Sequence, residues 1–246
     1  MVHVEEIRIM KAMILAAGEG TRLRPLTLET PKALLPLAGT PLIQRTLTWL
    51  KSHGISDVAI NLCYLGDKIK GFLGDGSRFG MNILYSSEEI ALGTAGGVKK
   101  MEHFFDDAFV VVYGDILTDF DLSAMVRFHQ QKKAMATLVI FEVPNPREAG
   151  IVEMTGEGRI VSLVEKPQSP ASASANGGIY VLQKEVLDHI PVNKFYDFAY
   201  DVFPGLIDSG LPVYGYPLKP EDYLIDIGNV DKYRKANEWL LGTERS

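Results

Sequence analysis

Residues 12–27 read AMILAAGEGTRLRPLT, and this stretch decides the fold class of the chain. It begins as an apolar run, which predicts a buried strand over residues 12–17, and then breaks into a turn around Gly18 and Gly20. Glycines in such a turn let backbone N–H groups approach an anion without interference from a Cβ atom. Arg22 adds a planar cationic fork, and Lys32 follows as a point charge. The pattern predicts a strand and turn that hold the phosphates of a nucleoside triphosphate.

Two other glycine-rich phosphate loops do not fit this stretch. A dinucleotide-binding G-x-G-x-x-G motif needs a third glycine where the chain has Leu23, and a Walker loop needs Gly-Lys followed by Ser or Thr, which is absent here. An ordinary strand and turn with a surface arginine is the plain alternative for a lone Gly-x-Gly. The longer motif, with Pro31 and Lys32 downstream, argues against that alternative and against a Rossmann oxidoreductase.

Strand-like and helix-like patterns alternate along the chain. The expected strands cover residues 58–62, 82–85, 108–113, 136–143, 151–154 and 160–164, and the expected helices cover 42–52, 66–72, a segment from the cap Asp121 to 132, and 230–241. This alternation indicates an α/β fold, a three-layer Rossmann-like sandwich with a mostly parallel central sheet. Because we find no linker and no repeat, we expect one domain over residues 10–241, with residues 1–9 as an N-terminal extension or a mis-assigned start.

The composition is that of a globular protein. Of 246 residues, 46% are hydrophobic and 23% are charged, and the net charge is −6. No basic excess favours a nucleic acid or an anionic membrane as partner, and no apolar run reaches the length of a membrane span. Cys63 is the one cysteine, so no intrachain disulfide can form, and we expect a reducing compartment, the cytoplasm.

Two aspartates stand at the ends of expected strands. Asp115 follows the apolar run at residues 108–113, and Asp226 precedes Gly228 in a similar context. Open α/β sheets bind ligands at the carboxyl ends of their strands, and Mg²⁺ in nucleotide sites takes one or two carboxylates together with phosphate oxygens and water. An aspartate after a strand is more often a turn or capping residue. The residues alone therefore leave a metal site and a pair of turn residues as alternatives.

Together these motifs resemble those of the sugar-1-phosphate nucleotidylyltransferases, the family that makes nucleotide sugars. The resemblance rests on LAAGEGTRLRP at residues 15–25, PK at 31–32, LGTAGG at 92–97, GD at 114–115, EKP at 165–167, NGGIY at 176–180 and DIG at 226–228. It implies a nucleotidyltransferase that joins a nucleoside monophosphate from a nucleoside triphosphate to a sugar 1-phosphate and releases pyrophosphate, with Mg²⁺ as cofactor. We expect no left-handed β-helix domain, which some members of the family carry after the catalytic domain.

The resemblance also implies roles for single residues. Those expected to contact the nucleotide are Leu15, Ala17, Gly18, Gly20, Thr21, Glu88, Gly93 and Thr94. Those expected to contact the sugar phosphate are Gly150, Glu165, Lys166 and Asn176. Catalytic contacts to phosphate are implied for Arg22, Lys32 and Lys166, and Mg²⁺ binding for Asp115 and Asp226. The implied reaction is an in-line attack of a sugar-phosphate oxygen on the α-phosphorus, which needs no side-chain nucleophile.

The base and the sugar are less clearly indicated. Glu88 resembles the base-reading position that thymidylyltransferases fill with Gln, and a carboxylate can accept from both N1–H and N2–H₂ of guanine. This residue and the LGTAG motif favour GTP with mannose 1-phosphate; glucose 1-phosphate or another sugar 1-phosphate with dTTP or UTP is the alternative. A regulatory subunit that binds nucleotide sugars is the non-enzyme alternative, although it would be expected to have lost Arg22, Asp115 or Asp226. A homo-oligomer is compatible with the sequence.

Overall fold

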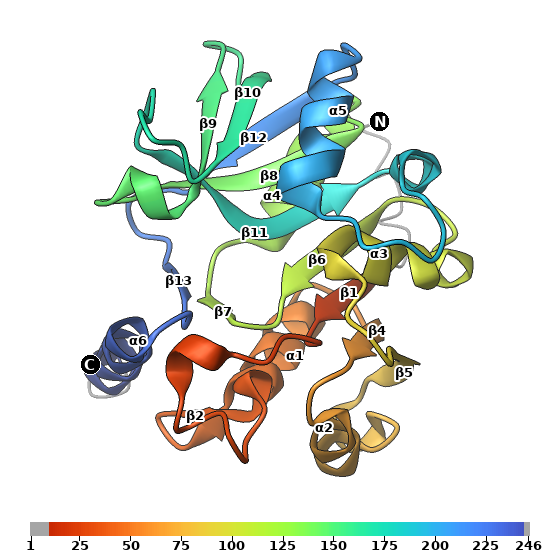
Figure 1. Ribbon diagram of the computed structural model, residues 1–246, viewed down its shortest axis with the longest axis vertical. Coiled ribbons are helices and arrows are strands. Elements are labelled where there is room, and N and C mark those ends of the chain that lie inside the picture. The colour runs from red at the N-terminus through yellow and green to blue at the C-terminus, as the bar shows by residue number, and fades with distance from the viewer. Residues whose placement is uncertain (1–9, 244–246) are drawn as a thin grey trace, which may run out of the picture.

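The computed structural model describes residues 10–243 and shows a central sheet flanked by helices (Figure 1). The extension expected over residues 1–9 lies outside the described residues. Within them, the main sheet consists of β1 (Lys11–Leu15), β4 (Asp57–Leu62), β5 (Asn82–Ser87), β6 (Phe109–Tyr113), β8 (Ala136–Glu142), β9 (Gly150–Met154), β10 (Ile160–Glu165), β11 (Ser174–Leu182) and β12 (Val213–Pro217). The order is β10-β9-β11-β6-β1-β4-β5, and β8 pairs with both β11 and β12. The strand that leads into the glycine turn therefore lies inside the sheet.

The sheet is parallel in its first half and mixed in its second. β5, β4, β1 and β6 are parallel neighbours, so their carboxyl ends meet at one edge. β11 is antiparallel to β6, β8 and β9, and β12 is parallel to β8. The half that carries the glycine turn thus has the parallel arrangement that the sequence predicts.

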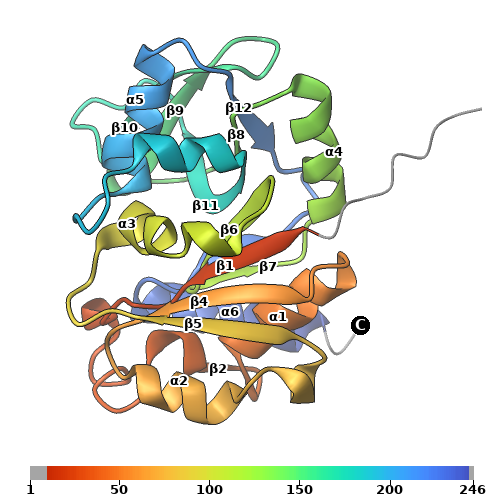
Figure 2. The same cartoon turned by 90° about the vertical axis from the view of Figure 1, so that its right-hand side faces the viewer.

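Helices cover both faces of the sheet. On one face pack α1 (Leu42–Ser52), α2 (Gly66–Leu73) and α4 (Leu122–Lys132), and on the other α3 (Gly93–Lys100) and α5 (Phe203–Asp208). Successive side chains of β1 point to opposite faces of the sheet. Ala12 and Ile14 pack in the core under α1, whereas Met13 packs in the core under α3. Figure 2 shows α1 and α4 on one side of the sheet and α3 and α5 on the other, which confirms the three-layer α/β fold. No helix among residues 10–243 has the length and apolar character needed to cross a membrane.

A third, smaller core fastens the C-terminal helix α6 (Val230–Thr243) beside the glycine turn. Two short ribbons contribute to it, β2 (Pro36–Leu37) with β3 (Thr40–Pro41), and β7 (Ile116–Thr118) with β13 (Leu224–Asp226). The rings of Tyr223 and Trp239 stack with their centroids 3.7 Å apart, and Asn237 Oδ1 accepts a hydrogen bond of 2.9 Å from Ala38 N. α6 therefore packs against both the segment that follows the glycine turn and the strand β13, which ends at Asp226.

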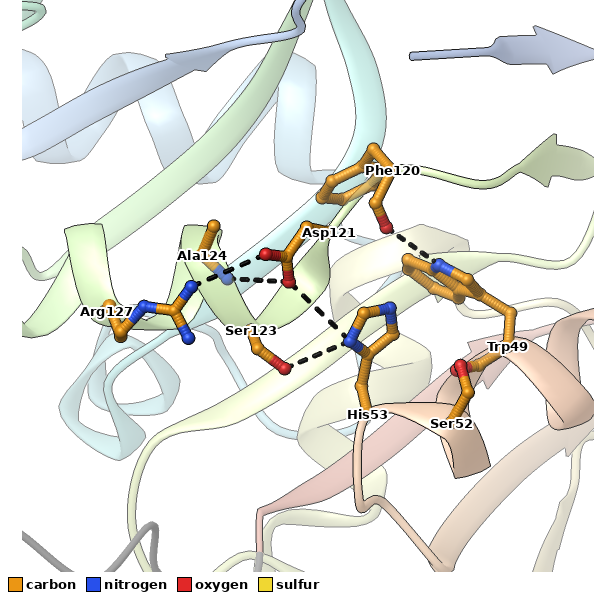
Figure 3. A network of polar contacts seen from close by, with 8 residues as sticks. All are labelled: Trp49, Ser52, His53, Phe120, Asp121, Ser123, Ala124 and Arg127. Atoms are coloured by element: carbon orange, nitrogen blue, oxygen red, sulfur yellow. Dashed lines mark hydrogen bonds and ion pairs between the residues drawn. The ribbon is translucent and has the colours of Figure 1, made fainter. Parts of the chain in front are cut away.

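The contact between α1 and α4 is polar at its edge (Figure 3). His53 Nδ1, just after α1, lies 3.0 Å from Ser123 Oγ and 3.8 Å from Asp121 Oδ1. Burial lowers the pKa of His53, and the carboxylate of Asp121 opposes that shift. A cavity of about 380 Å³ adjoins this network, and its wall includes Met10, which directly precedes β1. The network therefore lies at the amino end of β1, opposite the glycine turn, and serves to join two helices.

The predicted elements are all present, with bounds within two residues of those expected. α1 has the predicted bounds, and Asp121 caps α4, its Oδ1 accepting a hydrogen bond of 3.0 Å from Ala124 N. The sequence pattern did not predict α3, α5, β11 or β12. Two of these, α3 and β11, carry residues of the candidate site.

Candidate active site

A cavity of about 270 Å³ opens where β1 and β6 end. Its wall consists of Leu15, Ala16, Ala17, Gly18, Gly20, Lys32, Ala33, Asn61, Ala91, Gly93, Thr94, Tyr113, Gly114, Asp115 and Asp197. The carboxyl edge of parallel strands is where sheets of this kind bind ligands. The cavity therefore occupies the position that the sequence predicts for a nucleotide.

The glycine turn forms one wall of this cavity. Gly20 has a left-handed backbone with φ of +63°, and a Cβ atom there would lie 3.1 Å from Thr27 Cγ2 and 3.3 Å from Lys32 Cβ. Thr27 Oγ1 donates a hydrogen bond of 2.8 Å to the Gly20 carbonyl, which holds the turn in this shape. At Gly18, by contrast, a Cβ atom would meet nothing within 4 Å. The backbone of the turn is thus open to an incoming anion on the cavity side.

The two aspartates meet through a strand pair. β13 pairs with β7 so that Asp226 lies opposite Ile116, and Ile227 N donates a hydrogen bond of 2.8 Å to the Asp115 carbonyl. The aspartates are therefore neighbours across two adjacent chain segments, although Asp226 itself is not part of the cavity wall. Sequence spacing alone could not show this, since more than a hundred residues separate the two strands.

Cations compensate both carboxylates. Lys32 Nζ lies 2.5 Å from Asp115 Oδ2, and Lys232 on α6 pairs with Asp226. Arg22 is close as well, because a Cβ atom at Gly228 would lie 2.4 Å from Asp226 Oδ1 and 3.3 Å from Arg22 Nη2. Three cationic side chains thus lie near the two carboxylates, and of these five residues Lys32 and Asp115 belong to the cavity wall.

This arrangement fits a divalent cation. Among residues 10–243, no group of three or more His, Cys, Asp or Glu side chains forms a candidate metal site. Mg²⁺ in nucleotide sites needs only one or two carboxylates, since phosphate oxygens and water complete its shell. Asp115 and Asp226 would hold the ion, and a bound Mg²⁺ would supply charge neutralisation at the α-phosphate.

A second group of predicted residues gathers on β9, β10 and β11. Glu165 pairs with Gly150 across the ladder, and a Cβ atom at Gly150 would lie 2.5 Å from Glu165 Oε2 and 3.7 Å from Asn176 Cβ. Burial raises the pKa of Glu165, and the ammonium of Lys166 opposes that shift from 3.7 Å. Lys166 has a left-handed backbone with φ of +49°, and its side chain is 55% exposed. The structure therefore brings Gly150, Glu165 and Asn176 together and leaves the Lys166 ammonium accessible.

Tyr113, which the sequence did not single out, connects the two groups through Tyr180. Tyr113 ends β6 in the cavity wall, and its ring meets that of Tyr180 edge to face at 5.7 Å. Asn176 Nδ2 donates a hydrogen bond of 2.9 Å to Tyr180 Oη. Burial raises the pKa of Tyr113 well above its usual range, and the Asp197 carboxylate adds to the shift. Tyr113 could have been noticed from its position before Gly114 and Asp115, whereas Asp197 has no such signal.

Asp197 is part of the cavity wall and holds neighbouring groups in place. Its Oδ2 accepts a hydrogen bond of 2.8 Å from Thr94 Oγ1, and its Oδ1 accepts one of 2.9 Å from Ala199 N at the start of a π-helix, Phe198–Val202. The Thr94 hydroxyl in turn accepts a hydrogen bond of 2.9 Å from Phe198 N. Thr94 therefore lines the cavity, and its hydroxyl is already hydrogen-bonded to Asp197 and Phe198.

The predicted residues divide between the cavity wall and its surroundings. Those in the wall are Leu15, Ala17, Gly18, Gly20, Lys32, Gly93, Thr94 and Asp115. Those outside it are Thr21, Arg22, Glu88, Gly150, Glu165, Lys166, Asn176 and Asp226. Glu88 is buried at 6% exposure and accepts hydrogen bonds of 2.9 Å from Asn61 Nδ2 and Leu92 N. Of its two partners, Asn61 is itself part of the cavity wall, and the sequence did not single it out.

Comparisons with known proteins agree with this geometry. A model of the nucleotidyl transferase family matches residues 11–242. The UTP–glucose-1-phosphate uridylyltransferase of Synechocystis sp. is 41% identical over 251 residues, which cover 96% of this chain and 64% of that protein. The mannose-1-phosphate guanylyltransferase of Mycobacterium tuberculosis is 37% identical over 232 residues, which cover 94% of this chain and 64% of that protein. The chain thus spans just under two thirds of the length of these two curated relatives.

A solved structure shows the same fold. It is a Bacillus anthracis protein, provisionally named a glucose-1-phosphate thymidylyltransferase and crystallised with sucrose, with a TM-score of 0.85, 28% identity and 94% of each chain covered. The family match extends over nearly all of the described residues, and the relatives' names share one type of reaction. The chain belongs to the nucleotidyl transferase family.

Proposed function

We propose that this protein transfers a nucleoside monophosphate from a nucleoside triphosphate to a sugar 1-phosphate and releases pyrophosphate. The observation that carries the proposal is the convergence of the glycine turn, Arg22, Lys32, Asp115 and Asp226 at the carboxyl edge of the sheet. The glycine turn and the cations can bind the phosphates of a triphosphate, and the carboxylate pair can bind the Mg²⁺ that accompanies it. The names of the relatives support the same reaction class.

The side chains divide the work by position. A sugar-phosphate oxygen forms the new bond to the α-phosphorus, the bond from that phosphorus to the bridging oxygen breaks, and its electron pair leaves with pyrophosphate. We assign Arg22 and Lys32 to the triphosphate and Lys166 to the incoming phosphate, which it orients for attack. Glu165 would accept hydrogen bonds from sugar hydroxyls, and Asn176 would accept hydrogen bonds from them or donate hydrogen bonds to them. No side chain needs to act as nucleophile, since the sugar phosphate is already ionised near neutral pH.

For the substrate pair, we propose GTP with mannose 1-phosphate first and UTP or dTTP with glucose 1-phosphate second. The first pair is supported by the LGTAG motif and by the guanylyltransferase relative, and the second by the uridylyltransferase relative. A regulatory subunit without activity is disfavoured, because Arg22, Asp115 and Asp226 are present and gathered in one place.

A substrate panel tests this proposal. The protein is incubated with Mg²⁺ and each combination of GTP, UTP, dTTP and ATP with mannose 1-phosphate and glucose 1-phosphate, while pyrophosphate is measured and the nucleotide sugar is identified by mass spectrometry. We expect one pair to dominate and both products to appear in equal amounts. Absence of pyrophosphate with every pair, together with binding of a nucleotide sugar, would support the regulatory subunit instead.

A further inference from the structure

A buried chain of hydrogen bonds links three segments of the nucleotide cavity. Asn61, on β4, is 2% exposed, and its Oδ1 accepts a hydrogen bond of 2.9 Å from Ala16 N, directly after β1. Its Nδ2 donates a hydrogen bond of 2.9 Å to Glu88 Oε1, and Glu88 Oε2 accepts one of 2.9 Å from Leu92 N, directly before α3. The glycine turn, β4 and the start of α3 are thus connected by two side chains.

The chemistry of the groups fixes the direction of every bond. A backbone N–H can only donate, so Asn61 must turn its oxygen toward Ala16 and its nitrogen toward Glu88. Glu88 then faces a donor at each oxygen, which is the arrangement that a buried carboxylate requires. Both oxygens are directed at the protein frame, and Glu88 itself is not part of the cavity wall.

The helix α3 rests directly on this pair. A Cβ atom at Gly97 would lie 2.6 Å from Asn61 Nδ2 and 2.9 Å from Glu88 Oε1, so only glycine allows the helix backbone to come this close. Ala16 and Asn61 belong to the cavity wall, and so do Gly93 and Thr94 at the start of α3. A displacement of Asn61 and Glu88 would therefore move these two parts of the wall relative to each other.

We propose that Glu88 is a positioning residue of the nucleotide site, which acts through Asn61 and Leu92 to hold the glycine turn and the start of α3 at the correct separation, and does not touch the base. The inference rests on the proposed function in one respect, that the cavity binds the nucleoside triphosphate. It makes Glu88 a determinant of affinity for every triphosphate and assigns the choice of base to groups in the cavity wall.

A pair of complementary substitutions tests this role. Glu88→Gln leaves one acceptor and one donor where both neighbours donate, so one hydrogen bond is lost. Asn61→Asp places a second carboxylate against Glu88, and the hydrogen bond between positions 61 and 88 is lost. In the double variant, the new carboxylate accepts from Ala16 N and from the new amide at position 88, whose oxygen accepts from Leu92 N. All three hydrogen bonds are then present again. In the bond between positions 61 and 88, the donor and the acceptor have changed places.

Triphosphate binding by calorimetry and steady-state kinetics with GTP, UTP and dTTP are measured for wild type, both single variants and the double variant. We expect Glu88→Gln to weaken the binding of all three triphosphates by a common factor of about ten. The affinities of the double variant should lie within about threefold of those of wild type. Glu89→Gln removes the same charge at an exposed neighbouring side chain and should change nothing. The contrary outcome is that Glu88→Gln changes the order of preference among the bases. If that change persists in the double variant, Glu88 contacts the base and the proposal is wrong.

Amide hydrogen exchange on the nucleotide-free protein separates this proposal from the proposed function. We expect faster exchange at Ala16 and Leu92 in the single variants and wild-type exchange in the double variant. Unchanged exchange in both single variants would overturn the positioning role, whatever the kinetics show. A wild-type protein that transfers no nucleotide would overturn the proposed function, while the exchange data would still decide whether Glu88 holds the two segments.

Discussion

Gly97 offers a sharp test of how closely α3 packs on the site. In Gly97→Ala, the new methyl group would lie 2.6 Å from Asn61 Nδ2 and 2.9 Å from Glu88 Oε1. Against an ordinary contact distance of about 3.5 Å, the two atoms must move by about 0.9 and 0.6 Å. Overpacking of this kind costs about 1–3 kcal/mol, and alanine recovers about 1 kcal/mol as the better helix former. We therefore expect a net loss of about 0–2 kcal/mol in the free energy of unfolding and about tenfold weaker triphosphate binding.

Gly71→Ala is the matched control, because Gly71 also lies inside a helix, α2, and a Cβ atom there would meet nothing within 4 Å. We expect this variant to be more stable by up to about 1 kcal/mol and to bind triphosphate normally. Urea unfolding and calorimetric titration of both variants give the comparison. If Gly97→Ala gains stability as Gly71→Ala does and keeps its affinity, the close packing of α3 on Asn61 and Glu88 is not what shapes the cavity.

Three further predictions concern other parts of the protein. Arg22→Lys keeps the charge but loses the fork that holds two phosphate oxygens, so kcat should fall more than triphosphate affinity; equal kinetics would remove Arg22 from the transition state. Lys166→Ala should raise KM for the sugar phosphate and lower kcat, while calorimetry shows unchanged triphosphate binding; the opposite pattern would place Lys166 on the nucleotide side. His129 is buried against Thr137 and Gln183, and burial lowers its pKa to about 4. Since its pKa in the unfolded chain is about 6.5, stability should decline by up to about 3 kcal/mol as the pH falls from 6.5 to 4. Urea unfolding across this range should show a shallower decline in His129→Gln, and identical slopes would exclude His129 as the cause.

The fold could be predicted where the sequence pattern and the packing agree. β6 and, after Lys11, β1 are apolar runs, because both faces of these parallel strands are covered by helices. α3 escaped prediction because its eight residues include three glycines, which are poor helix formers. Tertiary contact explains all three: a Cβ atom would lie 2.5 Å from the Tyr196 carbonyl oxygen at Gly93 and 2.6 Å from the Lys194 carbonyl oxygen at Gly96, and at Gly97 it would meet Asn61. β11 begins with small and polar residues and has an irregular register between Asn176 and Tyr180, so its first half does not read as a strand.

The candidate site was predictable in its motifs but not in its connections. The glycine turn, Lys32 and Asp115 stand in recognisable local patterns and meet at the cavity. Lys232, Asn61 and Asp197 act on those motifs from distant segments, and a single sequence contains no signal for such contacts. Glu88 illustrates the difference, since its position suggested a base contact and its buried hydrogen bonds point to the frame of the cavity.

The proposed reaction depends most directly on the carboxylate pair, Asp115 and Asp226. The decisive measurement is the rate of nucleotide-sugar formation at limiting Mg²⁺ by wild type, Asp115→Asn and Asp226→Asn, with Mn²⁺ binding to each protein followed by electron paramagnetic resonance. We predict that wild type forms the nucleotide sugar, that each variant remains folded, and that each loses at least about a hundredfold in rate together with its Mn²⁺ binding. Near-normal rates in both variants would contradict the assignment of the metal site and the mechanism built on it.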